Sequence, residues 1–129
     1  MGQSHPTSRL PVLVIEDEPV LRLYVMDIVE EAGFEPVEAP SAALAIRILE
    51  QRPDIRIVYM DLDMPRGVKG IEIAAAIRNR WPPIEIILTA AFLTRGEIAL
   101  PDRAEFYPKP IQRDWMIEAM RRMAGQQDS

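Results

Sequence analysis

The sequence predicts an α/β protein whose parallel sheet is covered by helices on both faces. Short apolar runs that suit strands alternate along the chain with longer stretches of helical periodicity, as in successive βα units. The apolar run at residues 55–60 is continuous, which is typical of a central strand buried on both faces. The length of 129 residues suits one domain with a single substantial core.

The first half of the chain carries ordinary start and stop signals. A strand is expected over residues 12–15, and Pro19 suits the first turn of the helix that follows. Gly33 is expected to end that helix, and residues 34–37 offer a second strand. Ser41 is a candidate N-cap for the second helix. Apolar residues recur at helical spacing in the first helix: Val20, Leu21, Tyr24, Val25, Ile28 and Val29.

The second half is less regular. After the third strand, a helix is expected over residues 70–80 and a fourth strand over residues 84–88. The segment 90–103 contains glycine and proline, which limit any helix there. A fifth strand at 104–107 precedes a last helix at 112–123. The expected inward face of the third helix is Ile71, Ala74, Ala75 and Ile77, and the apolar stripe of the last is Trp115, Met116, Ala119, Met120 and Met123.

Composition excludes several classes of function. Fifteen basic and twenty acidic residues give a net charge of −5, which disfavours general binding to nucleic acid. The lack of cysteine excludes thiolate chemistry and is compatible with a reducing cytosol. No apolar run approaches membrane-spanning length. The only histidine, His5, lies in a tail of residues 1–9, expected to be disordered or cloning-derived, so histidine acid–base catalysis in the core is not expected.

Acidic residues follow two of the predicted strands. The first strand delivers Glu16, Asp17 and Glu18, and the third ends on Asp61. The C-terminal ends of parallel strands share one edge of the sheet, where such folds place their chemistry. Like charges about 4 Å apart repel by roughly 4 kcal/mol at an effective dielectric of 20. These acids must therefore partly protonate, gain a cationic partner such as Lys109, or hold a metal, and the sequence predicts a phosphoryl or metal site.

The ordered set of residues at this edge resembles the receiver domain of two-component response regulators, over residues 10–123. Its parts are the acidic pair, Asp61 followed by Met64-Pro65, Thr89 after the fourth strand and Lys109-Pro110 after the fifth. The resemblance implies a flavodoxin-like (βα)5 fold, a doubly wound parallel five-stranded sheet with helices on both faces. It implies a cytoplasmic, stand-alone receiver domain over residues 10–124, with a C-terminal tail at 125–129.

The resemblance also assigns roles to the acids. Asp61 would be the phosphoacceptor, because carboxylate nucleophiles form aspartyl phosphates. Mg²⁺ would be held by Asp61, by Asp17 directly, and by Glu16 directly or through water. Asp63 would offer its backbone carbonyl to the metal. The Asp63 carboxylate would either orient water for dephosphorylation or lie in solvent.

Three further positions match the family after the fourth and fifth strands. Thr89 would donate its hydroxyl to a phosphoryl oxygen, and Lys109 would pair with Asp61 or with the phosphate. Pro110 resembles the family's cis-proline. Phe106 stands where the family has an aromatic switch and would turn into the space that Thr89 vacates. The alternative for Phe106 is a plain core residue of the fifth strand.

The chain departs from the family pattern at several points. The loop between Met64-Pro65 and Gly70 is one residue longer than the common pattern, and Lys69 stands where an acid often precedes that glycine. Glu18, beside a proline, is expected to favour the positive end of a helix rather than a metal. The fourth helix region is shortened and contains proline, so the family's dimer geometry is not transferred to this chain.

The implied function is that of a phosphorylatable receiver in a phosphorelay. A histidine kinase or histidine phosphotransfer protein would donate the phosphoryl group to Asp61 in a Mg²⁺-dependent step. The switched surface near Phe106 and the last helix would then contact a downstream protein target. The receiver would be autocatalytic at most rather than an enzyme on an external substrate. It would be a monomer or a weak homodimer, without nucleic-acid or membrane partners.

Two rival interpretations remain open at this stage. Asp61-Leu62-Asp63 after an apolar strand looks like the nucleophile and acid–base pair of a haloacid-dehalogenase-like phosphatase. That family expects Thr or Val at the position of Pro65, and a later acidic pair that the segment after the fourth strand lacks. The other rival is an inert flavodoxin-like interaction module, which the joint presence of acceptor, acidic pair, hydroxyl and lysine disfavours.

Overall fold

The computed structural model describes residues 9–63 and 70–128. Within these ranges, five parallel strands form one sheet in the order β2-β1-β3-β4-β5. The strands are β1 (Pro11–Ile15), β2 (Glu35–Ala39), β3 (Ile57–Asp61), β4 (Glu85–Ala90) and β5 (Ala104–Pro108). This strand order is that of the flavodoxin-like doubly wound folds, so the predicted fold class is confirmed. The expected tail up to residue 8 and the Met64-Pro65 pair lie outside the described residues.

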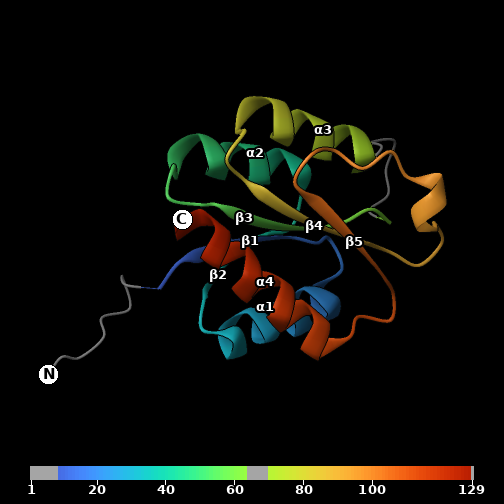
Figure 1. The fold of residues 1–129 in the computed structure, drawn as a ribbon, viewed down its shortest axis with the longest axis horizontal. Helices are drawn as coiled ribbons and strands as arrows, with labels where there is room; N and C mark the ends of the chain where they lie inside the picture. Colours follow the sequence, from blue (N-terminus) through green and yellow to red (C-terminus); the bar gives the residue numbers. More distant parts are fainter. Residues whose placement is uncertain (1–8, 64–69, 129) are drawn as a thin grey trace, which may run out of the picture.

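Four α-helices in the described part of the chain cover the two faces of the sheet (Figure 1). One face carries α1 (Pro19–Ala32) and α4 (Arg113–Asp128), and the other carries α2 (Ala42–Gln51) and α3 (Gly70–Arg80). Successive side chains of a strand point to opposite faces, so each central strand contributes to both cores. Buried β-strand residues of the α1/α4 core are Val12, Val14, Ile57, Tyr59 and Ile87, and those of the α2/α3 core are Leu13, Ile15, Val58, Met60, Ile86, Leu88 and Phe106.

Local signals in the sequence explain where the first helices begin and end. The Glu18 carboxylate caps α1 by accepting hydrogen bonds from the backbone N–H groups of Val20 and Leu21, as the sequence suggested. Gly33 ends the helix in the left-handed region, at φ 101°, which a residue with a side chain rarely adopts. Ser41 caps α2 by accepting from the Leu44 N–H.

The connection between β4 and β5, residues 91–103, contains little helix, as the sequence predicted. It contains one turn of 3-10 helix, η2 (Arg95–Glu97), with no buried residue. The other connections between the described strands contain the α-helices α1, α2 and α3. The connection from β4 to β5 therefore contains much less helix than the other connections (Figure 1).

The predicted inward face of α3 is wrong at Ala75, which is exposed. Apolar spacing did not mean burial in two other helices. In α1, Val20 is 74% exposed and Tyr24 is 41% exposed, and in α4, Trp115 is 52% exposed, one position away from buried Met116. The last helix also continues beyond residue 123, to Asp128.

In the part of the chain that the structure describes, none of the helices combines the length and the apolarity needed to cross a lipid bilayer.

Candidate functional site

The C-terminal edge of the sheet brings together residues that are far apart in the sequence. In the β3–β4 register, Asp61 lies opposite Thr89. In the β1–β3 register, Ile15 lies opposite Met60, so Glu16 follows at the level of Asp61. A hollow of about 500 Å³ opens at this edge, and its polar lining includes Glu16, Asp17, Asp61, Asp63 and Lys109. The sequence predicted this convergence from the strand ends alone.

Asp61 is the central acid of this group and is deeply buried. Its side chain is 4% exposed, and the Lys109 ammonium lies 2.7 Å from its Oδ2 atom. Its other oxygen, Oδ1, accepts a hydrogen bond of 2.8 Å from the backbone N–H of Asp63. Burial opposes the charge of Lys109, but hydrogen bonds to Asp61 and Asp63 outweigh it and hold the pKa of the ammonium above its usual value. The Lys109 ammonium is therefore held charged inside the hollow by the two acids beside it.

Asp63 links three strand ends rather than lying free in solvent. Its Oδ2 atom is 3.0 Å from the Lys109 ammonium and accepts a 2.7 Å hydrogen bond from the backbone N–H of Ala91. The side chain is 16% exposed. The carboxylate therefore ties the ends of β3, β4 and β5 together.

Glu16 is buried to 1% exposure, and its carboxyl is only half satisfied. Oε2 accepts a hydrogen bond of 3.1 Å from the Glu18 N–H, whereas Oε1 has no partner among the described residues. Burial first, and the nearby Asp61 carboxyl second, raise the pKa of Glu16 to about 8. At neutral pH and without a cation, this group therefore tends to keep a proton. Asp17, the next residue, is half-buried and lines the same hollow.

Thr89 is fully buried, and its hydroxyl has a partner that the sequence analysis missed. The Tyr59 hydroxyl lies 2.9 Å from Thr89 Oγ1. Burial raises the pKa of Tyr59 far above its usual value, although the hydrogen bond with Thr89 acts in the opposite direction. Tyr59 looked like one more bulky residue of a buried strand. The available signal was its position two residues before Asp61, which puts both side chains on the same face of β3.

The residues around Lys109 match several expectations. The peptide bond between Lys109 and Pro110 is cis. The Phe106 ring is 7% exposed and packs in the α2/α3 core, whereas Tyr107 packs against the opposite core. Burial comes first among the causes that raise the pKa of Tyr107, whose hydroxyl donates a 2.6 Å hydrogen bond to Glu105.

The donor set of the hollow fits Mg²⁺. Within residues 9–63 and 70–128, no three acidic or imidazole side chains are already close enough to ligate one ion. Mg²⁺ does not need three, because proteins commonly bind it through one or two carboxylates together with waters and substrate oxygens. The buried Glu16 Oε1 atom without a partner, beside Asp61, is the kind of oxygen that a divalent cation satisfies.

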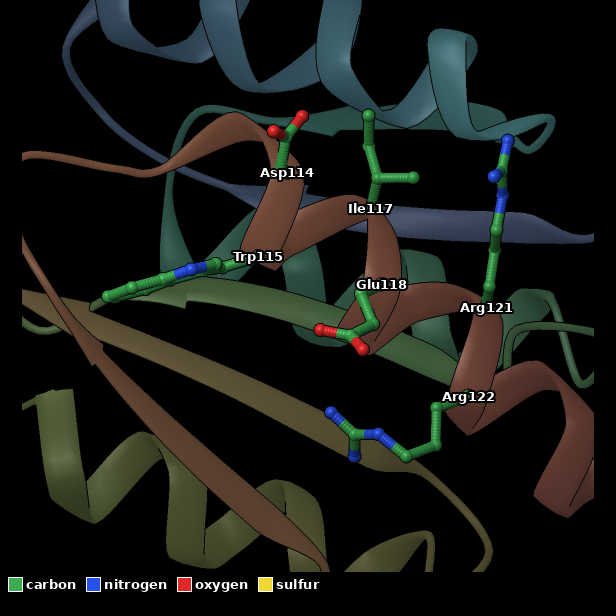
Figure 2. A pocket seen from close by; sticks show the side chains of 6 residues that line it. All are labelled: Asp114, Trp115, Ile117, Glu118, Arg121 and Arg122. Atoms are coloured by element: carbon green, nitrogen blue, oxygen red, sulfur yellow. The ribbon is translucent and has the colours of Figure 1, made fainter.

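Other hollows in the described structure lack this chemistry. A hollow of about 640 Å³ is lined by α4 side chains alone, among them Trp115, Glu118 and Arg122 (Figure 2). Another, of about 420 Å³, lies between Leu62, α3 and the η2 region and is mostly apolar. Neither hollow includes the acids of the strand edge.

Comparisons with known proteins agree with the fold. The family model for the response regulator receiver domain matches residues 12–121. A response regulator receiver protein from Sinorhizobium medicae WSM419 has a TM-score of 0.82 at 22% identity, over 94% of this chain and 98% of its own. A receiver domain protein from Clostridium thermocellum has a TM-score of 0.77 at 20% identity, over 92% and 96% of the two chains.

A third solved structure is longer than this chain. It is described as a two-component system response regulator/GGDEF domain protein, with a TM-score of 0.78 at 25% identity. The match covers 93% of this chain and 51% of that one. No curated protein sequence matches this chain closely. The resemblance inferred from the sequence is nevertheless confirmed by the family match, and the chain belongs to the response regulator receiver domains of two-component systems.

Proposed function

We propose that this receiver accepts a phosphoryl group on Asp61 from a phosphohistidine of a histidine kinase or a histidine phosphotransfer protein. The observation that carries the proposal is the pair of Asp61 and Lys109, 2.7 Å apart in a hollow that opens at the edge of the sheet, with Thr89 opposite Asp61 in the β3–β4 register. A carboxylate nucleophile needs an accessible oxygen and a way to offset the charge of the incoming group. The hollow and the ammonium support both requirements.

The transfer is a displacement at phosphorus. An oxygen of Asp61 forms the new P–O bond, while the P–N bond to the donor imidazole breaks and the imidazole nitrogen takes the electron pair and a proton. The Lys109 ammonium stays beside the carboxylate and pairs with a phosphoryl oxygen as the charge spreads. The Thr89 hydroxyl donates to another phosphoryl oxygen. These two groups orient the phosphoryl group without being consumed.

A divalent metal completes the charge balance. The carboxylates of Glu16, Asp17 and Asp61, with the backbone carbonyl of Asp63, are the proposed ligands, some acting through water. When bound, Mg²⁺ neutralises the transferring phosphoryl oxygens. The side chains around Asp61 then hold its carboxylate in line with the phosphoryl donor.

Phosphorylation is proposed to shift a conformational equilibrium toward an active surface. Thr89 moves toward the phosphoryl group, and Phe106, which packs in the α2/α3 core beside β4, changes its side-chain position in response to the shift of β4. Reversing a population of 1:99 requires about 5.5 kcal/mol of differential interaction. The switched surface near Phe106 and α4 then binds a downstream protein.

The acceptor is tested by intact-mass analysis after incubation with acetyl phosphate and Mg²⁺. We expect the addition of one phosphoryl group, lost on treatment with base, and no addition in Asp61→Asn. Asp63→Asn is the matched control, because it changes a neighbouring acid of the same hollow and leaves the acceptor in place. A base-labile phosphoryl group that persists in Asp61→Asn would overturn the assignment.

The same experiment separates the rival interpretations. An inert interaction module would take no label, and Mg²⁺ would not change its melting temperature. A haloacid-dehalogenase-like phosphatase would use Asp63 as its acid–base group and would turn over phosphodonor continuously. The engagement of the Asp63 carboxylate by Lys109 and by the Ala91 N–H argues against that use.

A further inference from the structure

A buried pair of hydroxyl groups lies directly behind the proposed acceptor. Tyr59, on β3, and Thr89, on β4, are 1% and 0% exposed, and their hydroxyl oxygens are 2.9 Å apart. Tyr59 and Asp61 are two residues apart on one strand, so their side chains share the face of the sheet that α1 and α4 cover. Thr89 lies opposite Asp61 in the register. Within residues 9–63 and 70–128, the hydrogen bond from the phenol toward the site is the one it shares with Thr89.

The surroundings decide which hydroxyl donates to the other. Two hydroxyl groups carry two protons, but one hydrogen bond between them uses only one. The ring of Tyr59 lies in the α1/α4 core, whose members are apolar, and within residues 9–63 and 70–128 its hydroxyl has no other hydrogen-bond partner in the structure. Thr89 lies at the end of its strand, next to the acids. The phenolic proton thus has only Thr89 as an acceptor, and the threonine proton has the carboxylate-rich hollow.

We infer that Tyr59 is a positioning residue, which donates its phenolic proton to Thr89 Oγ1 and so turns the Thr89 hydroxyl proton toward Asp61. The inference rests on the proposed phosphoryl transfer and deepens it. In a chain of two hydroxyl groups, each hydrogen bond polarises the next, so the threonine becomes a stronger donor to a phosphoryl oxygen. Because the phenol already donates to Thr89 Oγ1, the threonine proton does not point back toward the phenol in the core. Orientation of the donor is then fixed before the phosphoryl group arrives.

A double-mutant cycle tests whether the phenol acts through the threonine. Tyr59→Phe removes one hydroxyl group and keeps the ring, and Thr89→Val removes the other at nearly constant volume. The readout is the rate of phosphorylation of Asp61 by acetyl phosphate with saturating Mg²⁺. Loss of a net hydrogen bond predicts that Tyr59→Phe slows the reaction about three- to tenfold. In the Thr89→Val background, the same substitution is expected to have no further effect.

The matched control is Tyr107→Phe. It also removes a phenolic hydroxyl that makes a hydrogen bond, in this case to Glu105 on β5, outside the hollow. Its phosphorylation rate should equal that of the wild type. The free energy of unfolding is measured for every variant, and coupling of the two hydroxyl groups in stability alone would not support the inference. The decisive quantity is the coupling in rate.

The possible failures of this experiment are distinguishable. Labelling that survives Asp61→Asn would overturn the proposed function and the inference with it. An unchanged rate in Thr89→Val would leave the acceptor intact but would remove the threonine through which Tyr59 must act. Equal slowing by Tyr59→Phe in both backgrounds would refute the positioning role and leave the function of Asp61 and Thr89 standing.

A second measurement does not depend on the folding of any variant. In the wild type, nuclear magnetic resonance should detect a slowly exchanging hydroxyl proton on Tyr59, with through-space contacts to the Thr89 side chain. Finding the slowly exchanging proton on Thr89 and directed at the phenolic oxygen would reverse the donor and overturn the inference.

Discussion

The Lys109 ammonium lies 2.7 Å from Asp61 and 3.0 Å from Asp63, so two acids of the strand edge share one cation. The three side chains are 19%, 4% and 16% exposed. A pair with this burial differs from the many exposed ion pairs on the surface, which contribute little to stability. Removing one member leaves the other acids without their internal counter-charge.

Lys109→Ala should therefore destabilise the protein in metal-free buffer. We expect a loss of about 1–3 kcal/mol in the free energy of unfolding, less than the cost for a fully buried pair because the lysine is partly exposed. Mg²⁺ should restore part of the loss by replacing the missing positive charge. Urea unfolding with and without Mg²⁺ measures both effects.

The control for this substitution is Arg52→Ala. Arg52 lies 2.8 Å from Asp54, but the two side chains are 35% and 55% exposed. Its loss should cost less than about 1 kcal/mol and should not respond to Mg²⁺. Equal destabilisation by the two substitutions would mean that burial does not strengthen the Lys109 pair.

Lys109→Ala should also change the response to phosphorylation. Even where Asp61 is still labelled, the variant should not show the full spectral shift that phosphorylation produces in the wild type.

The raised pKa of Glu16 predicts a specific pH dependence of stability. The usual value is 4.5 and the folded value is about 8, so the folded protein binds this proton more tightly than the unfolded chain does. The resulting stabilisation is fully present below pH 4.5 and is lost as the pH rises through about 8. Its size is roughly 1.4 kcal/mol for each unit of pKa difference.

Glu16→Gln should remove this component, because the amide does not titrate. The variant should become more stable than the wild type in metal-free buffer at the alkaline end of the interval. Denaturant unfolding at several pH values measures the difference. Glu50→Gln, on the exposed surface of α2, is the control and should keep the wild-type slope. Parallel curves for Glu16→Gln and the wild type would contradict the raised pKa.

Asp63 should control the stability of the segment that follows β4. Its carboxylate accepts the Ala91 N–H at 2.7 Å, and hydrogen bonds to charged acceptors are worth about 1.5–3 kcal/mol. Asp63→Ala should accelerate hydrogen exchange of the Ala91 amide by about tenfold or more. Asp63→Asn keeps an acceptor oxygen and should give a smaller change. If neither substitution alters exchange at Ala91, the carboxylate does not anchor this segment.

The proposed switch role of Phe106 is testable with a substitution that preserves volume. Phe106→Leu should cost less than about 1.5 kcal/mol in stability, unlike a truncation to alanine. Labelling of Asp61 should proceed at the wild-type rate, whereas the amide chemical-shift changes along β5 and α4 should largely disappear. Ile86→Val, in the same core, is the control. Persistence of the complete shift pattern in Phe106→Leu would make Phe106 a core residue only.

Most of the fold was predictable because buried parallel strands must be apolar and helix ends need particular residues. Pro19, Gly33 and Ser41 mark their positions in the sequence for reasons that do not depend on distant contacts. The exposure of Trp115 and Val20 was not predictable in this way. Helical periodicity indicates which side chains share a face, but not how far the sheet extends beneath that face.

The edge of the sheet was predictable in outline and not in detail. Acids at strand ends must converge in a parallel sheet, which is why Glu16, Asp61 and Lys109 line one hollow. The partner of Tyr59 depends on the register between β3 and β4, and the partner of the Asp63 carboxylate is a backbone group of a distant loop. Neither contact leaves a local pattern in the sequence.

The lack of an α-helix in the connection between β4 and β5 affects its local stability. η2 buries no residue, Phe92 is 86% exposed, and Ile98 and Leu100 pack only partly against the α2/α3 core. Opening this connection therefore uncovers less apolar surface than opening a buried strand, so we expect a lower free energy of local unfolding here. β4, immediately before it, is buried along its whole length. A structural change at the acidic hollow therefore acts both on a fully buried strand, β4, and on the exposed connection that follows it. We therefore expect residues 91–103 to change conformation more readily than β4 when the hollow is disturbed.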